Sequence, residues 1–91
     1  MADGVRDNPA LSRFELQTNG VTAIANYKVA GGVITFTHTE VPKQARHGGI
    51  ASRLIEGALE AARTRALKVV PRCSFVRAYM EQHPEFNDLL E

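Results

Sequence analysis

The stretch HTEVPKQARHGGIA, residues 38–51, decides the fold because it joins a strand pattern to a helix pattern. Before it, residues 33–41 are rich in β-branched side chains and stop at Pro42, which has no N–H to donate to a sheet. After it, residues 49–66 repeat apolar side chains at helical spacing. We therefore predict a strand, a short basic loop, and a helix whose first turn lies inside the loop.

Such a junction suits a bound anion. The first N–H groups of a helix have no partner within the helix and carry partial positive charge, so a phosphate can satisfy several at once. Gly48 and Gly49 allow close backbone approach. The side chains that can add charge or a donor are Lys43, Arg46, His47 and Arg53. The alternative is an ordinary turn between strand and helix in which glycine only eases the bend.

Length and composition fit one soluble domain over residues 1–91. A chain of 91 residues has room for one sheet and two helices, and 44% hydrophobic residues are enough for a core. A net charge of +1 gives no general attraction to nucleic acid. No apolar run is long enough to span a membrane or to act as a signal peptide, so we expect a cytoplasmic protein. Residues 1–10 are polar and irregular, and we expect them to be partly disordered.

The remaining elements follow from periodicity and turn signals. The predicted strands cover residues 13–17, 21–29, 33–41 and 67–70, and the predicted helices cover residues 49–66 and 74–82. Short turns join the first three strands, so they form an antiparallel meander. The fourth strand follows a helix and is expected to run parallel to the third. The fold class is thus α/β (α+β), in the order β-β-β-α-β-α.

Arg46, Gly49 and Ala51 fit the pattern R-x-x-G-x-A. This resembles the acyl-CoA pyrophosphate loop of the GNAT superfamily of N-acetyltransferases. The preceding residues 38–42 and the following stretches at 73–79 and 83–86 extend the likeness to the small YjdJ-type members, over nearly the whole chain from Phe14 to Phe86. The resemblance implies a minimal GNAT-like fold without the N-terminal helices that enclose the acceptor in larger relatives.

The resemblance also implies acetyl-CoA, or coenzyme A, as the cofactor. Main-chain groups of Thr39, Glu40 and Val41 would pair with its pantetheine arm, as a sheet edge pairs with an added strand. The residues implied to hold the pyrophosphate are Arg46, His47, Gly48, Gly49, Ile50 and Ala51.

Three side chains are catalytic candidates. His38 and Glu40 alternate onto one strand face, where either could take a proton from an amine, or could be an ordinary surface pair. Cys73 lies between a strand and a helix, where the helix dipole and Arg72 would favour the thiolate. In YjdJ-type proteins a cysteine at this place lies near the acyl-CoA sulfur. Cys73 is then an acid for the leaving thiol, a covalent acetyl carrier, or a small apolar residue that fills a corner.

The sequence thus predicts an acetyl-CoA-dependent N-acetyltransferase that acts on a primary amine, either a small molecule or a protein lysine. The alternative is a module that binds CoA with little or no transfer, and a third reading is a protein-interaction domain that lost the cofactor. No His, Asp, Glu or Cys spacing suggests a metal. We expect no nucleic-acid or membrane partner, and a monomer or homodimer.

Overall fold

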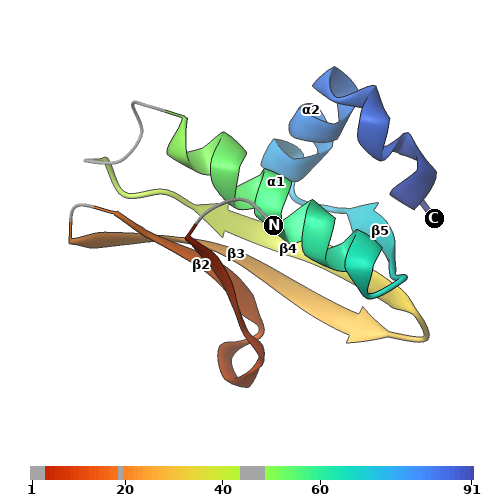
Figure 1. Cartoon of the computed structure of the whole chain (residues 1–91), viewed down its shortest axis with the longest axis horizontal. Helices are drawn as coiled ribbons and strands as arrows, with labels where there is room; N and C mark the ends of the chain where they lie inside the picture. Colours follow the sequence, from red (N-terminus) through yellow and green to blue (C-terminus); the bar gives the residue numbers. More distant parts are fainter. Residues whose placement is uncertain (1–3, 19, 44–48) are drawn as a thin grey trace.

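The computed structural model describes residues 4–18, 20–43 and 49–91. Its elements in chain order are β1 (Val5–Asn8), η1 (Pro9–Leu11), β2 (Arg13–Thr18), β3 (Val21–Ala30), β4 (Val33–Glu40), α1 (Ile50–Thr64), β5 (Lys68–Pro71), α2 (Ser74–Gln82) and η3 (Pro84–Leu89). Five strands form one sheet in the order β1-β2-β3-β4-β5 (Figure 1). Neighbours from β1 to β4 are antiparallel, and β4 and β5 are parallel. The predicted α+β fold, with a parallel strand after a helix, is confirmed.

The turn between β3 and β4 shows why the meander forms. Gly31 and Gly32 have φ angles of 59° and 78°. A two-residue hairpin loop with positive φ at both positions matches the right-handed twist of its strands, and glycine reaches these angles without strain. The glycine pair therefore fixes the β3–β4 register, in which Ala30 lies opposite Val33.

The expectation of disorder at residues 1–10 was wrong for the part that the structure describes. Val5–Asn8 forms β1, which pairs with β2 and extends the predicted three-strand meander to four strands. Pro9–Leu11 then forms a short 3-10 helix, and the Asn8 side chain accepts a hydrogen bond from the N–H of Leu11. The element order is therefore β-β-β-β-α-β-α. Only Val5 in β1 is buried, so the four-residue strand carries almost no hydrophobic pattern.

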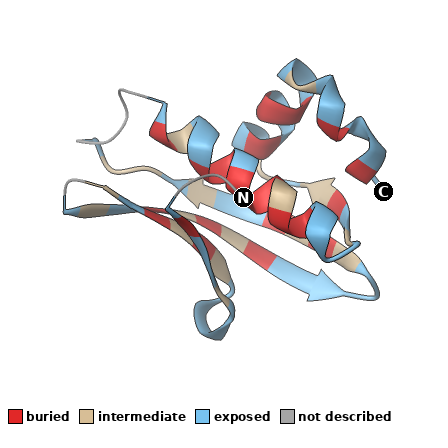
Figure 2. Cartoon of the chain, viewed as in Figure 1, coloured by how far each residue is buried: buried red, intermediate tan, exposed pale blue. Residues whose placement is uncertain are grey.

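The core lies between one face of the sheet and the helices (Figure 2). Phe14, Tyr27 and Phe36 form an aromatic cluster on that face, with ring centroids 5.2 to 6.5 Å apart. Leu54, Ile55 and Leu59 of α1 are fully buried, as the predicted helical stripe requires. We call the opposite side of the sheet the outer face; it carries Lys28, Thr35 and Thr37, among others.

The C-terminal tail packs against the rest of the domain. Phe86 and Leu89 of η3 are buried, and Leu90 forms a parallel bridge with Val69 of β5. Arg63 of α1 bonds to the Asp88 carboxylate and to the Glu85 carbonyl oxygen. These contacts hold the tail beside α1 and the β5 edge.

The helices in the described ranges are all too short or too polar to cross a lipid bilayer.

Candidate functional site

Strands β4 and β5 separate partway along their length. They pair from Val33 opposite Lys68 to Phe36 opposite Pro71. One more hydrogen bond follows, from the N–H of Cys73 to the carbonyl oxygen of Phe36 at 2.9 Å. Beyond it, β4 continues to Glu40 while the other chain turns into α2. The last residues of β4 therefore face the start of a helix instead of a neighbouring strand.

A β-bulge at the same level changes which side chains face the helices. Tyr27 lies opposite Phe36, but Asn26 lies opposite His38, so Thr37 is an extra residue in β4. An extra residue reverses the alternation of faces after it. Thr39 consequently lies opposite the fully buried Ala25, on the helix side of the sheet.

The bulge corrects the simple alternation expected from the sequence. In an unbroken strand the threonines at positions 35, 37 and 39 would share one face, yet Thr35 and Thr37 line the outer face and Thr39 contacts Cys73 on the other. His38 and Glu40 do share a face, as predicted, with Nε2 and Oε2 3.5 Å apart. They lie opposite Asn26 and Ile24, on the outer face, and most of each side chain is exposed. Their catalytic role stays a prediction, and the structure does not bring either one to the Cys73 side of the sheet.

Cys73 is placed as the N-cap residue of α2, with φ −68° and ψ 128°. Its half-buried sulfur lies 3.3 Å from Thr39 Oγ1. Burial alone would raise the pKa of the thiol, but the Thr39 hydroxyl and the nearby backbone of Val76, Phe75 and Thr39 outweigh burial and lower the pKa. An N-cap position favours the thiolate, because the partial positive charge of a helix start stabilises it.

A hollow lies beside Thr39, the residue that contacts Cys73, and extends to the start of α1. Its lining comes from β4, the residue after it, and the first turns of both helices, namely Thr39, Val41, Ala51 and Phe75. We call it the thiol groove. It has a volume of about 280 Å³ and is open to solvent. Phe75 leaves 40% of its side chain exposed there. Phe75 is therefore a site residue that the sequence analysis missed. It is a large apolar residue exposed at the start of α2, close to Cys73.

The start of α1 keeps the geometry that an anion site needs. Gly49 is its N-cap residue with φ 75°, and the helix start has no side-chain cap. A Cβ at Gly49 would meet no atom within 4 Å, so the space over this turn is open on the described side. Ile50 is buried, whereas Ala51 lines the thiol groove.

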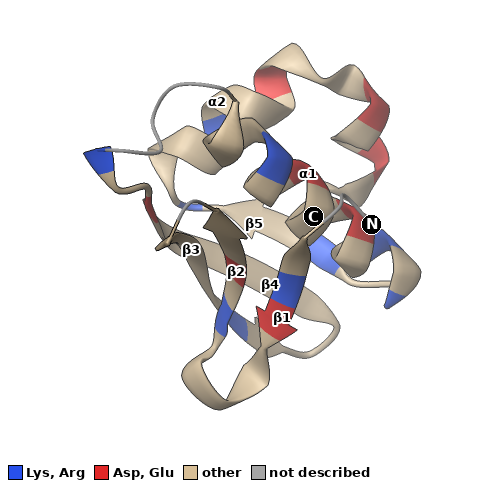
Figure 3. Cartoon of the chain, turned by 60° about the vertical axis from the view of Figure 1, so that its left-hand side comes forward, with Lys and Arg blue, Asp and Glu red and all other residues tan. Residues whose placement is uncertain are grey.

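The predicted phosphate loop is described only in part. Arg46, His47 and Gly48 lie outside the described residues. Lys43 and Arg53, on either side in the chain, are described, and Figure 3 shows basic segments before α1 and within its first turns.

Metal ligation finds no support in the described ranges. Within residues 4–18, 20–43 and 49–91, no three His, Cys, Asp or Glu side chains are grouped so that they could hold an ion.

Two comparisons relate the chain to known proteins. The sequence profile of the GCN5-related N-acetyl-transferases matches residues 13–89. The solution structure of a GCN5-like protein from Staphylococcus aureus, a proposed N-acetyltransferase, superimposes with a TM-score of 0.74. That likeness covers 100% of this chain and 91% of the other at 23% identity, so it shows a shared fold. Since the profile covers most of the chain, this protein belongs to the GCN5-related N-acetyltransferase family.

Proposed function

We propose that the protein is an acetyl-CoA-dependent N-acetyltransferase that moves the acetyl group directly from the thioester to a primary amine. The observation that carries this proposal is the contact between Cys73 and Thr39 at the point where β4 and β5 separate. The Cys73 thiol, whose pKa is lowered, lies there between the thiol groove and the separation of β4 and β5. Family membership supports the reaction class.

The residues present fit the cofactor. The thiol groove runs from Thr39 past Val41 to Ala51, and it joins the strand separation to an uncapped helix start. Backbone groups of Thr39 and Val41 would hold the pantetheine arm, and the α1 N–H groups near Gly49, Ile50 and Ala51 would hold the pyrophosphate. Arg46, His47 and Gly48, outside the described residues, complete the proposed binding set. When bound, acetyl-CoA supplies an acetyl group activated as a thioester.

The chain's own groups then have defined tasks. The reaction exchanges one C–S bond for one C–N bond, and the proton that the attacking amine loses ends on the released thiol. Cys73 would deliver that proton, because its contact with Thr39 and its place at the start of α2 make it a stronger acid than an ordinary thiol. A backbone N–H near Val41 would stabilise the developing oxyanion without reorganisation. His38 or Glu40 would accept the first proton of the ammonium ion from the outer face.

The first test is ligand binding. Acetyl-CoA should raise the melting temperature, since binding to the native state stabilises it by mass action. Gly49→Glu should remove the rise by placing a carboxylate at the proposed phosphate site. Gly49→Ala is the matched control, because it carries the same backbone strain without the charge. No rise with the unmodified protein would reject the cofactor assignment.

The second test is turnover. Acetyl-CoA with a panel of primary amines should give acetylated amine and free CoA, and Cys73→Ala should lower the rate while leaving CoA affinity nearly unchanged. Intact-mass measurement during turnover separates the two roles of Cys73, because a covalent mechanism would leave an acetyl group on the protein. Equal rates in Cys73→Ala and the unmodified protein would remove Cys73 from the mechanism.

A CoA-binding module without efficient transfer is the alternative. The open outer face favours it, because no helix in the described part of the chain covers that side of the strand separation. Binding of acetyl-CoA without acetylation of any amine would identify the protein as a CoA-binding module.

A further inference from the structure

We propose that the acceptor amine carries an anionic group, a carboxylate or a phosphate, and that Lys28 and Arg72 bind this group on the outer face of the sheet. The inference rests on the proposed function and adds the substrate class.

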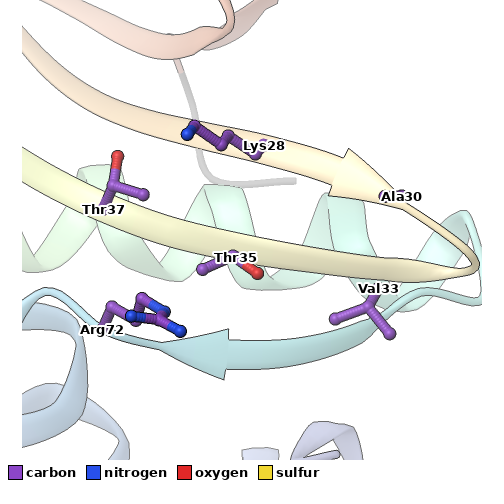
Figure 4. A pocket seen from close by; sticks show the side chains of 6 residues that line it. All are labelled: Lys28, Ala30, Val33, Thr35, Thr37 and Arg72. Carbon is purple, nitrogen blue, oxygen red and sulfur yellow. The ribbon is translucent and has the colours of Figure 1, made fainter.

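The outer face has a hollow beside the strand separation. It is lined by Lys28, Ala30, Val33, Thr35, Thr37 and Arg72, and we call it the polar hollow (Figure 4). The close-up shows Lys28 on one side of β4 and Arg72 on the other, with Thr35 and Thr37 between them. Lys28 lies opposite Thr35, and Thr35 lies opposite Val70. Arg72 is therefore two strand spacings across from Lys28 and two residues further along, roughly 12 Å away at the backbone. Both long side chains can reach one anion over the threonines.

The charges in the polar hollow are not balanced locally. Arg13, Arg63 and Arg65 each form an ion pair with a carboxylate. Neither Lys28 nor Arg72 has such a pair with any residue in 4–18, 20–43 or 49–91. No acidic side chain lines the hollow. Two unneutralised cations with hydroxyl groups between them match the donors that carboxylate and phosphate oxygens accept from.

The position of the polar hollow links it to transfer. Arg72 directly precedes Cys73, and Thr37 is the bulged residue at the level where the strands separate. The proposed cofactor groove lies on the helix side, so an acceptor reaches the gap from the outer face. Two hydrogen bonds of its main chain hold Arg72 there. Its N–H donates to the Val70 carbonyl oxygen, and its carbonyl oxygen accepts from Arg77 Nη2.

The charge on the outer face also changes from basic to acidic along β4. Glu40 lies three residues beyond Thr37, or about 10 Å along the strand, and pairs with His38. An acceptor with its anion over Thr35 would direct its ammonium group towards the carboxylate end of the face. Thr35 and Glu40 are five residues apart, or roughly 16 Å along the strand, so the geometry favours an extended molecule with an amine at one end and an anion at the other.

The experiment compares matched amines. A linear ω-amino carboxylic acid, the ω-amino phosphate of equal length and the neutral ω-amino amide are offered with acetyl-CoA. We expect kcat/KM for the anionic amines to exceed that for the amide by at least tenfold. The ratio should fall close to one in Lys28→Gln/Arg72→Gln, while Arg6→Gln, which removes one positive charge outside the hollow, should keep it. The two anionic probes show whether a carboxylate or a phosphate is preferred.

A binding measurement keeps this inference separate from the transferase proposal. Amide resonances of Thr35 and Thr37 are followed by nuclear magnetic resonance while the same three amines are added with CoA present. Shifts with the anionic amines alone, without any turnover, would uphold the anion site and reject the transferase. Equal resonance shifts with the ω-amino carboxylic acid and the ω-amino amide would overturn the inference. An unchanged preference for the anionic amines in Lys28→Gln/Arg72→Gln would do the same. Circular dichroism of the variant shows that its fold is intact.

Discussion

The sulfur of Cys73 lies 3.3 Å from Thr39 Oγ1, and this contact joins the start of α2 to the part of β4 beyond its bulge. Without the extra residue Thr37, Thr39 would face the opposite side of the sheet and the contact would not exist. The bulge therefore sets the chemistry of the thiol as well as the shape of the strand.

Thr39→Val should raise the pKa of Cys73. Burial already opposes ionisation of the thiol, and the Thr39 hydroxyl is the first of the hydrogen bonds that offset it. Valine keeps the volume and removes that bond. The rate of alkylation by iodoacetamide should fall several-fold at pH 7, and its midpoint should move to higher pH. Thr37→Val, on the outer face, is the matched control and should leave the profile in place; an unmoved midpoint in Thr39→Val would contradict the assignment.

Gly49→Ala should destabilise the fold through its backbone. The φ of 75° is left-handed, and the added Cβ meets no neighbouring atom, so strain is the expected cause. The expected cost is about 1–2 kcal/mol in the free energy of unfolding. Gly49→Asn should cost less, because asparagine tolerates this conformation. Urea unfolding measures both; equal stability of Gly49→Ala and the unmodified protein would show that the helix start relaxes to another conformation.

The regular elements could be predicted because local patterns determine them. Strands β2 to β4 alternate, α1 carries an apolar stripe, and Gly31-Gly32 marks the hairpin, so these agree closely with the structure. Strand β1 was missed because a four-residue edge strand with one buried side chain has no period to detect. Its stability comes from pairing with β2 and from contact with α1.

The junctions that carry the candidate site could be predicted from the chain, whereas the direction of some of its side chains could not. Ala51 lines the groove and Cys73 contacts its lining residue Thr39, and both Ala51 and Cys73 lie at strand-to-helix junctions in the chain. That Thr39 faces the helices, away from Thr35 and Thr37, could not be predicted, because a bulge depends on how β3 and β4 pair and leaves no mark in the β4 sequence. Phe75 was missed as a site residue because its helical spacing is equally typical of a core residue.

Gly57→Ala should destabilise the protein although alanine favours helices. A Cβ at Gly57 would lie 2.7 Å from Val5 Cβ and Cγ2, so α1 can approach β1 this closely only with glycine there. Helix propensity would contribute about 1 kcal/mol in favour of alanine. Overpacking should outweigh it and leave a net loss of about 1–2 kcal/mol.

A double-mutant cycle identifies the cause in the Gly57 variant. Val5→Gly removes the Cβ and both γ-carbons that crowd the new Cβ, so the loss on Gly57→Ala should be smaller in that background when measured by urea unfolding. Equal losses in both backgrounds would refute contact between α1 and β1 as the reason.

Tyr27→Phe should change how stability depends on alkaline pH. Burial, and then the hydrogen bond that Tyr27 Oη donates to Asp7 Oδ1 at 2.6 Å, raise the pKa of the phenol to about 12. In the unfolded chain the phenol ionises near pH 10. Above about pH 10 the unfolded state therefore loses this proton while the native state keeps it, so the free energy of unfolding falls as pH rises towards 12.

Phenylalanine has no proton to lose, so Tyr27→Phe should lack this part of the alkaline fall. At pH 8 the variant should be less stable by about 1 kcal/mol, because the hydrogen bond to Asp7 is gone. The difference between the two proteins should shrink as pH rises above about 10, since only the unmodified protein loses the contribution of Tyr27. Urea unfolding at several values between pH 8 and about 11 measures the difference. Curves that stay parallel would mean that the Tyr27 phenol titrates alike in the folded and unfolded chains, and the bond from β3 to β1 would then not stabilise the protonated form.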